Sequence, residues 1–146
     1  MKPEISVVIP AYNEEESLHP LFESLYPVMK EMKRPFEIIF INDGSKDSTL
    51  GILYDLYLSN PEVRVIDLNG NFGQHMAIMA GFEHVRGEIV ITLDADLQNP
   101  PEEIPNIVAK MDEGHDLVGT YRKGRQDPIF RKVASKMVNK ITNRIA

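Results

Sequence analysis

The sequence contains no cysteine and no hydrophobic run long enough to cross a membrane. The absence of cysteine excludes disulfide bonds and thiolate zinc sites, and it fits a reducing cytosolic setting. The first apolar run, residues 5–9, is too short for a signal peptide and follows a single lysine. Because no segment approaches ~18 uninterrupted apolar residues, no membrane span is expected. The length of 146 residues fits one domain with a sizeable core.

Charge is spread unevenly along the chain. Residues 1–121 carry eight Lys and Arg against 21 Asp and Glu, whereas residues 122–146 carry eight Lys and Arg against a single acid, Asp127. The net charge of −6 therefore hides a basic C-terminal segment on an acidic body. This asymmetry predicts an anionic partner for the basic segment, although a solvated helix face would have the same composition.

The basic segment has the pattern of an amphipathic helix, expected from about residue 128 onward. Its basic residues recur every four positions beside an apolar stripe; they are Lys132, Lys136, Lys140 and Arg144, next to Phe130, Val133, Met137 and Ile141. Such a helix can lie on an anionic membrane surface, and it can equally pack its apolar stripe on the sheet. Arg122 and Arg131 are the stronger candidates for binding an anion, because a guanidinium group pairs bidentately with phosphate.

Strand-like and helix-like segments alternate along the chain. Near-continuous apolar runs, typical of parallel strands covered on both faces, occupy residues 5–9, 37–41, 63–68, 88–93 and 116–121. Helical patterns occupy about residues 15–33, the segment after residue 47, residues 73–84 and the segment after residue 101. The alternation predicts the α/β class, with a doubly wound, mainly parallel sheet and helices on both faces. No internal repeat or linker divides residues 1–146, so a single domain is expected.

Two of the predicted helices have candidate core faces. In the first helix the apolar stripe consists of Leu18, Leu21, Phe22, Leu25 and Met29. In the third helix the residues expected to be buried are Met76, Ala77, Met79, Ala80 and Phe82. The second helix is expected to start with Ser45 or Asp47 as its N-cap. The fourth is expected to carry two acids in its first turn, where they complement the helix dipole.

Four loops are predicted to meet in one crevice. Ligands of open parallel sheets bind beyond the carboxyl ends of the strands, and residues 10–14, 42–45, 69–74 and 94–98 each directly follow a predicted strand. The ring of Tyr12 could pack on a base, and Asp43 could accept hydrogen bonds from one. The N–H groups at the start of the third helix could bind an anion such as a diphosphate. Turn formation and helix capping are the alternative roles for the same residues.

The segment 93–98, with the sequence LDADLQ, carries the most specific chemistry. A buried strand pattern ends there in two aspartates one residue apart, Asp94 and Asp96. An extended Asp-x-Asp points both carboxylates to the same side. Two hard oxygen ligands at a strand end suit Mg²⁺ or Mn²⁺, which commonly also hold a substrate phosphate. Two solvated acids at a strand end are the alternative interpretation.

Three ordered motifs together resemble the family 2 glycosyltransferases of the GT-A fold. They are SVVIPAYNEE at residues 6–15, NDGS at 42–45 and DADLQ at 94–98. The segments 71–82 and 93–105 are similar to a narrower branch, the polyprenyl-phosphate glycosyltransferases. That branch includes dolichol-phosphate mannose synthases and the undecaprenyl-phosphate 4-deoxy-4-formamido-L-arabinose transferases, the latter being the nearest likeness. The resemblance covers nearly the whole chain.

The resemblance implies roles for individual residues. The residues expected to bind the nucleotide are Pro10, Ala11, Tyr12, Glu14, Asp43, Asn71, Asp94 and Ala95. Asp94 and Asp96 would hold Mg²⁺ or Mn²⁺ and the donor diphosphate, and Gln98 would face the sugar or the acceptor. These three residues form the expected catalytic set, while Arg122 and Arg131 would meet donor or lipid phosphate.

The same resemblance implies a reaction and a cellular place. The expected activity is inverting, divalent-metal-dependent transfer of a sugar from a nucleotide-diphosphate sugar, UDP-sugar being favoured, to a polyprenyl phosphate. It is expected at the cytoplasmic face of the membrane, with the basic C-terminal helix on the membrane surface. No nucleic-acid partner is expected, and homo-oligomerisation stays open. The chain is expected to be the N-terminal, donor-binding part of a longer membrane-associated enzyme, with a nucleotide-sugar-binding fragment without turnover as the alternative.

One departure and two rival classes bear on this hypothesis. Family members often have two aspartates before Gly-Ser, whereas here the first is Asn42. A nucleotidyltransferase would carry a glycine-rich basic loop after the first strand, but residues 10–14 contain neither glycine nor a base. A phospho-acceptor receiver domain would need an aspartate after the third strand, where Leu68 and Asn69 stand instead.

Overall fold

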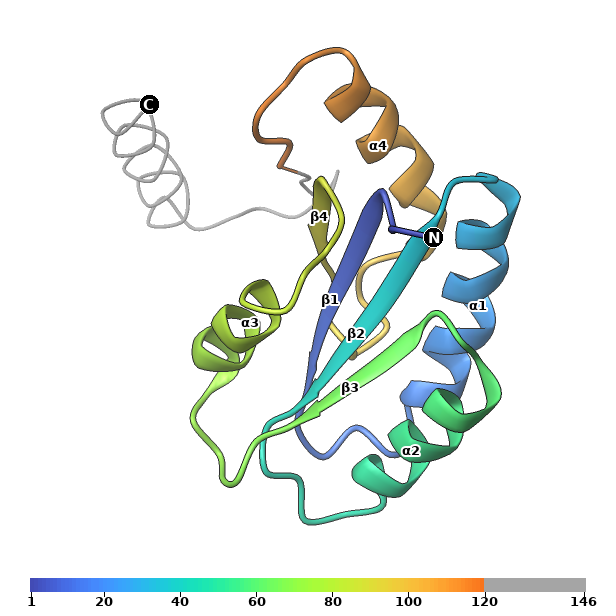
Figure 1. Cartoon of the computed structure of the whole chain (residues 1–146). Helices are drawn as coiled ribbons and strands as arrows, with labels where there is room; N and C mark the ends of the chain where they lie inside the picture. The colour runs from blue at the N-terminus through green and yellow to red at the C-terminus, as the bar shows by residue number, and fades with distance from the viewer. Residues whose placement is uncertain (120–146) are drawn as a thin grey trace, which may run out of the picture.

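A computed structural model of the chain describes residues 1–119 and contains a four-stranded parallel sheet (Figure 1). The strands lie in the order β3-β2-β1-β4, and every neighbouring pair is parallel. The elements in chain order are β1 (Ile5–Ala11), α1 (Leu18–Glu31), β2 (Phe36–Asn42), α2 (Thr49–Ser59), β3 (Val63–Asp67), α3 (Gln74–Phe82), β4 (Ile89–Thr92), the 3₁₀ turn η1 (Pro101–Glu103) and α4 (Ile104–Asp112). The predicted α/β class with a parallel sheet is confirmed.

The two central strands form the most deeply buried part of the molecule. β1 and β2 pair over seven residues each, from Ile5 opposite Phe36 to Ala11 opposite Asn42, and every one of these residues is buried. A strand buried on both faces needs apolar side chains on both sides. The near-continuous apolar runs of the sequence reflect this double burial.

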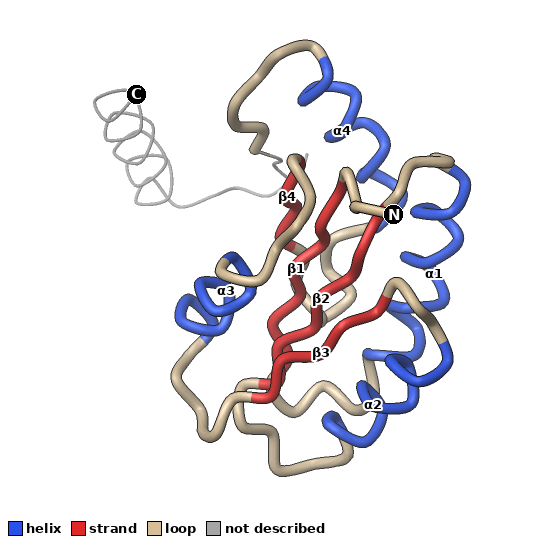
Figure 2. Tube along the Cα trace, in the orientation of Figure 1, coloured by secondary structure: helices blue, strands red, loops and turns tan. Residues whose placement is uncertain are grey.

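Helices cover both faces of the sheet, as Figure 2 shows. Residues of α1, α2 and α4 pack with β1 and β2 in the larger core cluster, whereas Ala77 of α3 packs with Val8, Ile39 and Ile41 on the opposite face. The predicted α1 stripe is confirmed for its four aliphatic and methionine members, which are fully buried, while Phe22 is partly buried. Within residues 1–119, no helix has the length and apolar character needed to cross a membrane.

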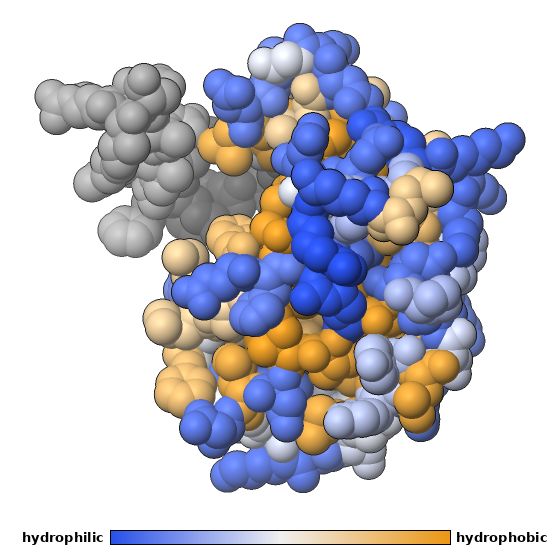
Figure 3. All heavy atoms as spheres, in the orientation of Figure 1, coloured by the Kyte–Doolittle hydropathy of each residue, from blue (hydrophilic) through white to orange (hydrophobic). Residues whose placement is uncertain are grey.

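Helix α3 departs from the predicted burial pattern. Its buried residues are the small Ala77 and Gly81, whereas Met76, Met79 and Phe82 are 58%, 54% and 40% exposed. A Cβ on Gly81 would lie only 2.5 Å from the side chain of Val8, so the helix lies very close to the sheet there. The prediction that the large side chains are buried was therefore wrong, because small residues make the contact. Figure 3 shows hydrophobic residues at the surface in this region.

The predicted fifth strand is not formed by its described part. Residues 116–119 have no strand structure, and the sheet of the described residues ends at β4, which pairs only with β1. A strand is held by hydrogen bonds to a neighbouring strand, and residues 116–119 make no such pairing with β4. The rest of that segment and the predicted helix from residue 128 lie outside the described residues.

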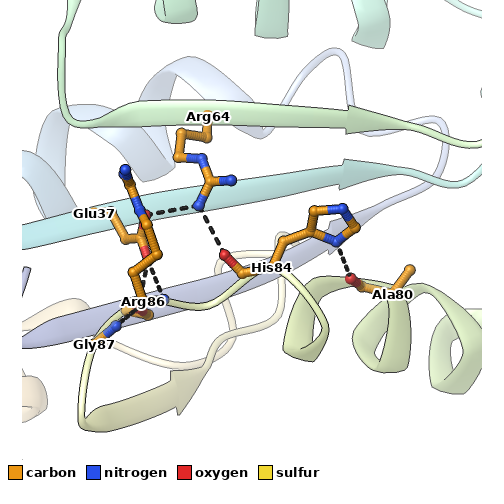
Figure 4. A network of polar contacts seen from close by, with 7 residues as sticks. Glu37, Arg64, Ala80, His84, Arg86 and Gly87 are labelled. Carbon is orange, nitrogen blue, oxygen red and sulfur yellow. Dashed lines mark hydrogen bonds and ion pairs between the residues drawn. The ribbon is translucent and has the colours of Figure 1, made fainter.

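Near the amino ends of the strands, a buried carboxylate forms hydrogen bonds with several segments of the chain (Figure 4). Glu37 of β2 is 1% exposed and accepts hydrogen bonds from Ser6, Arg64 and Arg86. The backbone N–H of Arg86 also donates to it, at 2.8 Å. Burial alone would raise the pKa of Glu37, but these hydrogen bonds outweigh it and hold the pKa below its ordinary value. The ionised carboxylate therefore links β1, β2, β3 and the segment before β4.

Replacing this carboxylate by the neutral amide in Glu37→Gln should lower the free energy of unfolding by about 2 kcal/mol at neutral pH. Because the folded-state pKa is lowered, the stabilisation is present above the unfolded-state pKa of about 4.3 and is lost as pH falls through the folded value. Urea unfolding of the two proteins should therefore converge in acid. The exposed Glu23→Gln is the control, and a constant difference at every pH would contradict the assignment.

The tight approach of α3 to the sheet can be tested with a matched pair of glycine substitutions. The added Cβ of Gly81→Ala would meet Val8 at 2.5 Å and Ile41 at 2.9 Å, and overpacking of this kind costs about 1–3 kcal/mol. The control Gly51→Ala in α2 has nothing within 4 Å and should stabilise by about 0.5–1 kcal/mol. Thermal unfolding measures both, and stabilisation by both substitutions would refute the close contact.

Candidate functional site

The four loops predicted to share a crevice do so at the carboxyl ends of the strands. A cavity of about 410 Å³ is lined by Pro10, Ala11, Tyr12, Glu14, Asp43, Asn71, Gly73, Gln74, Asp94, Ala95 and Asp96. All eight residues predicted for nucleotide binding are in this lining. Gly73 and Gln74 also line it but were absent from the predicted site residues, and their position at the start of a helix beside the crevice was the available signal.

The two aspartates of the Asp-x-Asp motif and the alanine between them all line the cavity. The motif follows β4 and forms a turn at Ala95 and Asp96, so the extended backbone expected from the sequence is wrong. Ala95 is 3% exposed and also belongs to the larger core cluster, and Leu97 has a positive φ of 63°. Both carboxylate residues nevertheless reach one cavity.

Both oxygens of Asp94 accept hydrogen bonds from side-chain amides. Gln74 donates its Nε2 to Oδ1 at 2.7 Å, and Asn99 donates its Nδ2 to Oδ2 at 3.2 Å. Asp96 accepts the backbone N–H of Gln98 at 3.2 Å. Gln98, predicted to face the sugar or the acceptor, does not line the cavity.

The carboxylate of Asp43 lies at the start of α3 and binds the backbone N–H groups there. Asp43 is 3% exposed, and its two oxygens accept the backbone N–H groups of Phe72 at 2.8 Å and Gly73 at 3.0 Å. The side chain of Asn71 also donates to the Asp43 carbonyl oxygen at 3.1 Å. The predicted placing of a diphosphate on these N–H groups is therefore wrong for these two donors, because Asp43 already occupies them.

Asn42, the departure from the family pattern, has a buried structural role. Its Nδ2 donates to Asp67 at 2.8 Å, and its Oδ1 accepts the backbone N–H of Ser45 at 3.2 Å. An amide can donate and accept at once, whereas a carboxylate can only accept. An aspartate at this position would face the carboxylate of Asp67, so asparagine fits the contact.

The loops after β1 and β2 are joined by a reciprocal set of hydrogen bonds, here called the cross-loop clasp. It consists of Asn13 N to Ser45 Oγ, Lys46 N to Asn13 Oδ1, Glu14 N to Thr49 Oγ1, Glu15 N to Asp47 Oδ2 and Ser48 N to Glu15 Oε2. The N-cap of α2 is Ser48, which makes no side-chain capping hydrogen bond, so the expected N-cap at Ser45 or Asp47 is wrong; Asp47, the residue before Ser48, accepts the N–H of Thr49 at 2.9 Å. The clasp holds the backbone N–H groups of residues 13–15, so it fixes the chain at Glu14 and directly after Tyr12, two residues of the cavity lining.

The donor set fits a divalent cation shared with a ligand. Among residues 1–119, no group of three or more His, Cys, Asp or Glu is arranged to hold a metal ion. Asp94 and Asp96 therefore offer two carboxylates, which leaves coordination positions for other oxygens. Mg²⁺ is usually held in this way, by one or two carboxylates together with substrate phosphates and water. The predicted phosphate contacts Arg122 and Arg131 lie outside the described residues.

Comparison with known proteins identifies the family. Residues 6–145 match the family described as glycosyl transferase family 2. This chain belongs to glycosyl transferase family 2. The parallel sheet with covering helices is the fold that solved glycosyltransferases share with it.

Several solved structures resemble this family 2 domain. Residues 1–349 of S. aureus TarS in complex with UDP-GlcNAc match at 26% identity and a TM-score of 0.64, covering 88% of this chain and 37% of that one. Glucosyl-3-phosphoglycerate synthase from Mycobacterium tuberculosis, in complex with Mn²⁺, UDP-Glc and phosphoglyceric acid, matches at 25% identity and a TM-score of 0.65, covering 84% and 45%. The family 2 domain thus spans less than half the length of either relative.

A mannosyltransferase from Pyrobaculum calidifontis, in complex with GDP-Man and Mn²⁺, has the same fold. It matches at 24% identity and a TM-score of 0.58, covering 75% of this chain and 32% of that one. At this identity the likeness concerns the arrangement of strands and helices alone. Structures with uridine and with guanosine nucleotides therefore both share the fold of this family 2 domain.

The tight packing of the loop after β3 over Gly44 generates a prediction for binding. Gly44 has a φ of +69°, and a Cβ there would lie 2.5 Å from the backbone of Gly70. Gly44→Ala should therefore displace the loop that carries Asn71 and weaken the nucleotide binding expected at this cavity by about tenfold or more, since each 1.4 kcal/mol of strain is a factor of ten. Gly70→Ala is the control because its Cβ meets only ordinary contacts at 3.7 Å. Equal affinities of both variants, measured by calorimetry, would refute the prediction.

Proposed function

We propose that the cavity binds a nucleotide-diphosphate sugar together with Mg²⁺ or Mn²⁺. The observation that carries the proposal is the charge of the lining, which among residues 1–119 contains the four carboxylates of Glu14, Asp43, Asp94 and Asp96 but no Lys, Arg or His. An anionic diphosphate would be repelled by this surface unless a cation lay between them. Asp94 and Asp96 are the residues that would hold the cation.

The remaining lining residues suit the nucleoside. Tyr12 is 43% exposed at the cavity and offers a ring face for a base, while Glu14 and Asn71 offer polar groups to base or ribose. Asp43 keeps lone pairs for a base N–H, because among the described residues each of its carboxylate oxygens accepts one backbone hydrogen bond and has room for another. A UDP-sugar is the favoured donor, since the relatives of 25% identity or more include complexes with UDP-GlcNAc and UDP-Glc.

The proposed acceptor is a polyprenyl phosphate at the cytoplasmic face of the membrane. The likeness of residues 93–105 to the polyprenyl-phosphate branch supports it, as does the basic segment 122–146 with Arg122 and Arg131. A phosphate monoester of second pKa about 6 is largely ionised at neutral pH. It therefore needs little help from a general base.

The proposed reaction is a single displacement at the anomeric carbon. A phosphate oxygen of the acceptor forms a bond to that carbon from the face opposite the diphosphate. The bond between the carbon and the diphosphate oxygen breaks, and the electron pair leaves with the nucleoside diphosphate, so the configuration inverts. When bound, the divalent cation stabilises the negative charge that develops on the leaving group.

A nucleotide-sugar-binding module without turnover is the second candidate. It is favoured by one fact, that this chain spans less than half the length of the enzymes it resembles. The two candidates share the donor site and differ in transfer. Incubation of the chain with a UDP-sugar, Mn²⁺ and a short-chain polyprenyl phosphate separates them, because only the first yields glycosylated lipid phosphate.

The donor site itself is tested by calorimetric titration of UDP and of GDP, each with and without Mn²⁺. We expect one nucleotide to bind in a Mn²⁺-dependent manner. Asp96→Ala should abolish the metal-dependent part, a loss of more than about 100-fold, because even indirect partners of a metal contribute 10–100-fold. Removal of an exposed acid on α2, in Asp55→Ala, should leave the titration unchanged.

Two results would contradict the donor-site proposal. One is the absence of Mn²⁺-dependent binding of either nucleotide to the wild-type chain. The other is an Asp96→Ala variant that keeps the full Mn²⁺ effect, which would place the cation away from the Asp-x-Asp motif.

A further inference from the structure

Gln74, the first residue of α3, reaches across the cavity to the motif after β4. Its Nε2 lies 2.7 Å from Oδ1 of Asp94, and both residues line the cavity. An ionised carboxylate can only accept hydrogen bonds, so the amide nitrogen of Gln74 must be the atom that faces it. Donation to a charged acceptor makes this one of the stronger kinds of protein hydrogen bond.

The backbone that carries Gln74 is itself anchored. The two preceding residues, Phe72 and Gly73, donate their N–H groups to Asp43 at the end of β2. At the other end of the helix, Gly81 packs against Val8 of β1. α3 is thus held at both ends, so its first side chain is presented to the cavity from a fixed backbone.

The contact spans the sheet. Asp43 follows β2 and Asp94 follows β4, and β1 lies between these two strands in the sheet order β3-β2-β1-β4. Residues 72–74 therefore form a bridge, with its backbone on one aspartate and its side chain on the other. Asn99 holds the second oxygen of Asp94 at 3.2 Å, so hydrogen bonds from two directions determine the orientation of this carboxylate.

We propose that Gln74 is a positioning residue, which orients the Asp94 carboxylate so that Asp94 and Asp96 together bind the divalent cation. The inference rests on the proposed donor site. Hydrogen-bonding partners of metal-binding carboxylates orient their ligands, and their loss typically costs 10–100-fold in metal affinity. Without the amide, Oδ1 of Asp94 loses the partner that fixes its rotation about the side-chain bond.

The test replaces the amide without changing the length of the side chain. Gln74→Met keeps a similar shape but has no N–H, and Gln74→Asn keeps the amide but is one methylene shorter. The matched control is Asn106→Leu, which removes an exposed amide-to-carboxylate hydrogen bond from Asn106 of α4 to Glu103, the residue directly before α4. UDP is the probe nucleotide, or GDP if the wild-type chain binds that one.

The measured quantity is the ratio of the nucleotide Kd without Mn²⁺ to the Kd with Mn²⁺, determined by calorimetry together with the Tm. We expect both Gln74 variants to lower this ratio about tenfold, in addition to any change that the lost hydrogen bond makes to the Tm. Asn106→Leu should keep the wild-type ratio. A merely structural role would instead move the Tm and the metal-free Kd and leave the ratio as it was, which would overturn the inference.

The experiment distinguishes the donor-site proposal from the role of Gln74. If Mn²⁺ does not change the nucleotide Kd of the wild-type chain, both the donor-site proposal and the role of Gln74 are refuted. If Mn²⁺ lowers the nucleotide Kd of the wild-type chain and of both Gln74 variants by the same factor, only the role of Gln74 is refuted.

Discussion

The parallel pairing of β1 and β2 is the constraint on which the other features depend. Seven residues of each strand pair in register, and all of them are buried. Since both faces of this pair must be covered, the chain crosses from one strand to the next through helices. The parallel direction then places every loop that follows a strand at the same edge. The cavity is a direct consequence of that direction.

The carboxylates at the two ends of the sheet have different hydrogen-bond donors. At the amino end, the single buried carboxylate of Glu37 meets two arginines and a serine, so its charge is compensated within the fold. At the carboxyl end, Asp43 accepts hydrogen bonds from backbone N–H groups and Asp94 from side-chain amides, all of them neutral donors, and no cationic side chain of residues 1–119 lines the cavity. The negative charge that no described cation balances therefore lies where a ligand can enter, and it favours a cation.

The sequence predicted an element correctly where its apolar residues have the same spacing as the residues that are buried in the structure. The four strands β1 to β4, the stripe of α1 and the position of the Asp-x-Asp motif directly after a strand were all predicted from runs or spacings of a few residues. Prediction failed for α3, where Met76, Met79 and Phe82 lie outward because Ala77 and Gly81 make the contact with the sheet. Small residues leave little trace in a hydrophobic pattern, although they allow the closest approach. The prediction of strand structure also failed for residues 116–119, because a strand needs a partner strand, which no run of apolar residues reports.

The sequence by itself determined the class of fold, the edge of the sheet at which chemistry occurs and the family, because these depend on alternation and on short contiguous motifs. Only the tertiary structure decided which donors each carboxylate meets. Asp43 and Phe72 are far apart in the chain, as are Gln74 and Asp94, and their hydrogen bonds exist only because β2, α3 and β4 come together. Distances of this kind arise from packing between elements, and no local pattern encodes them.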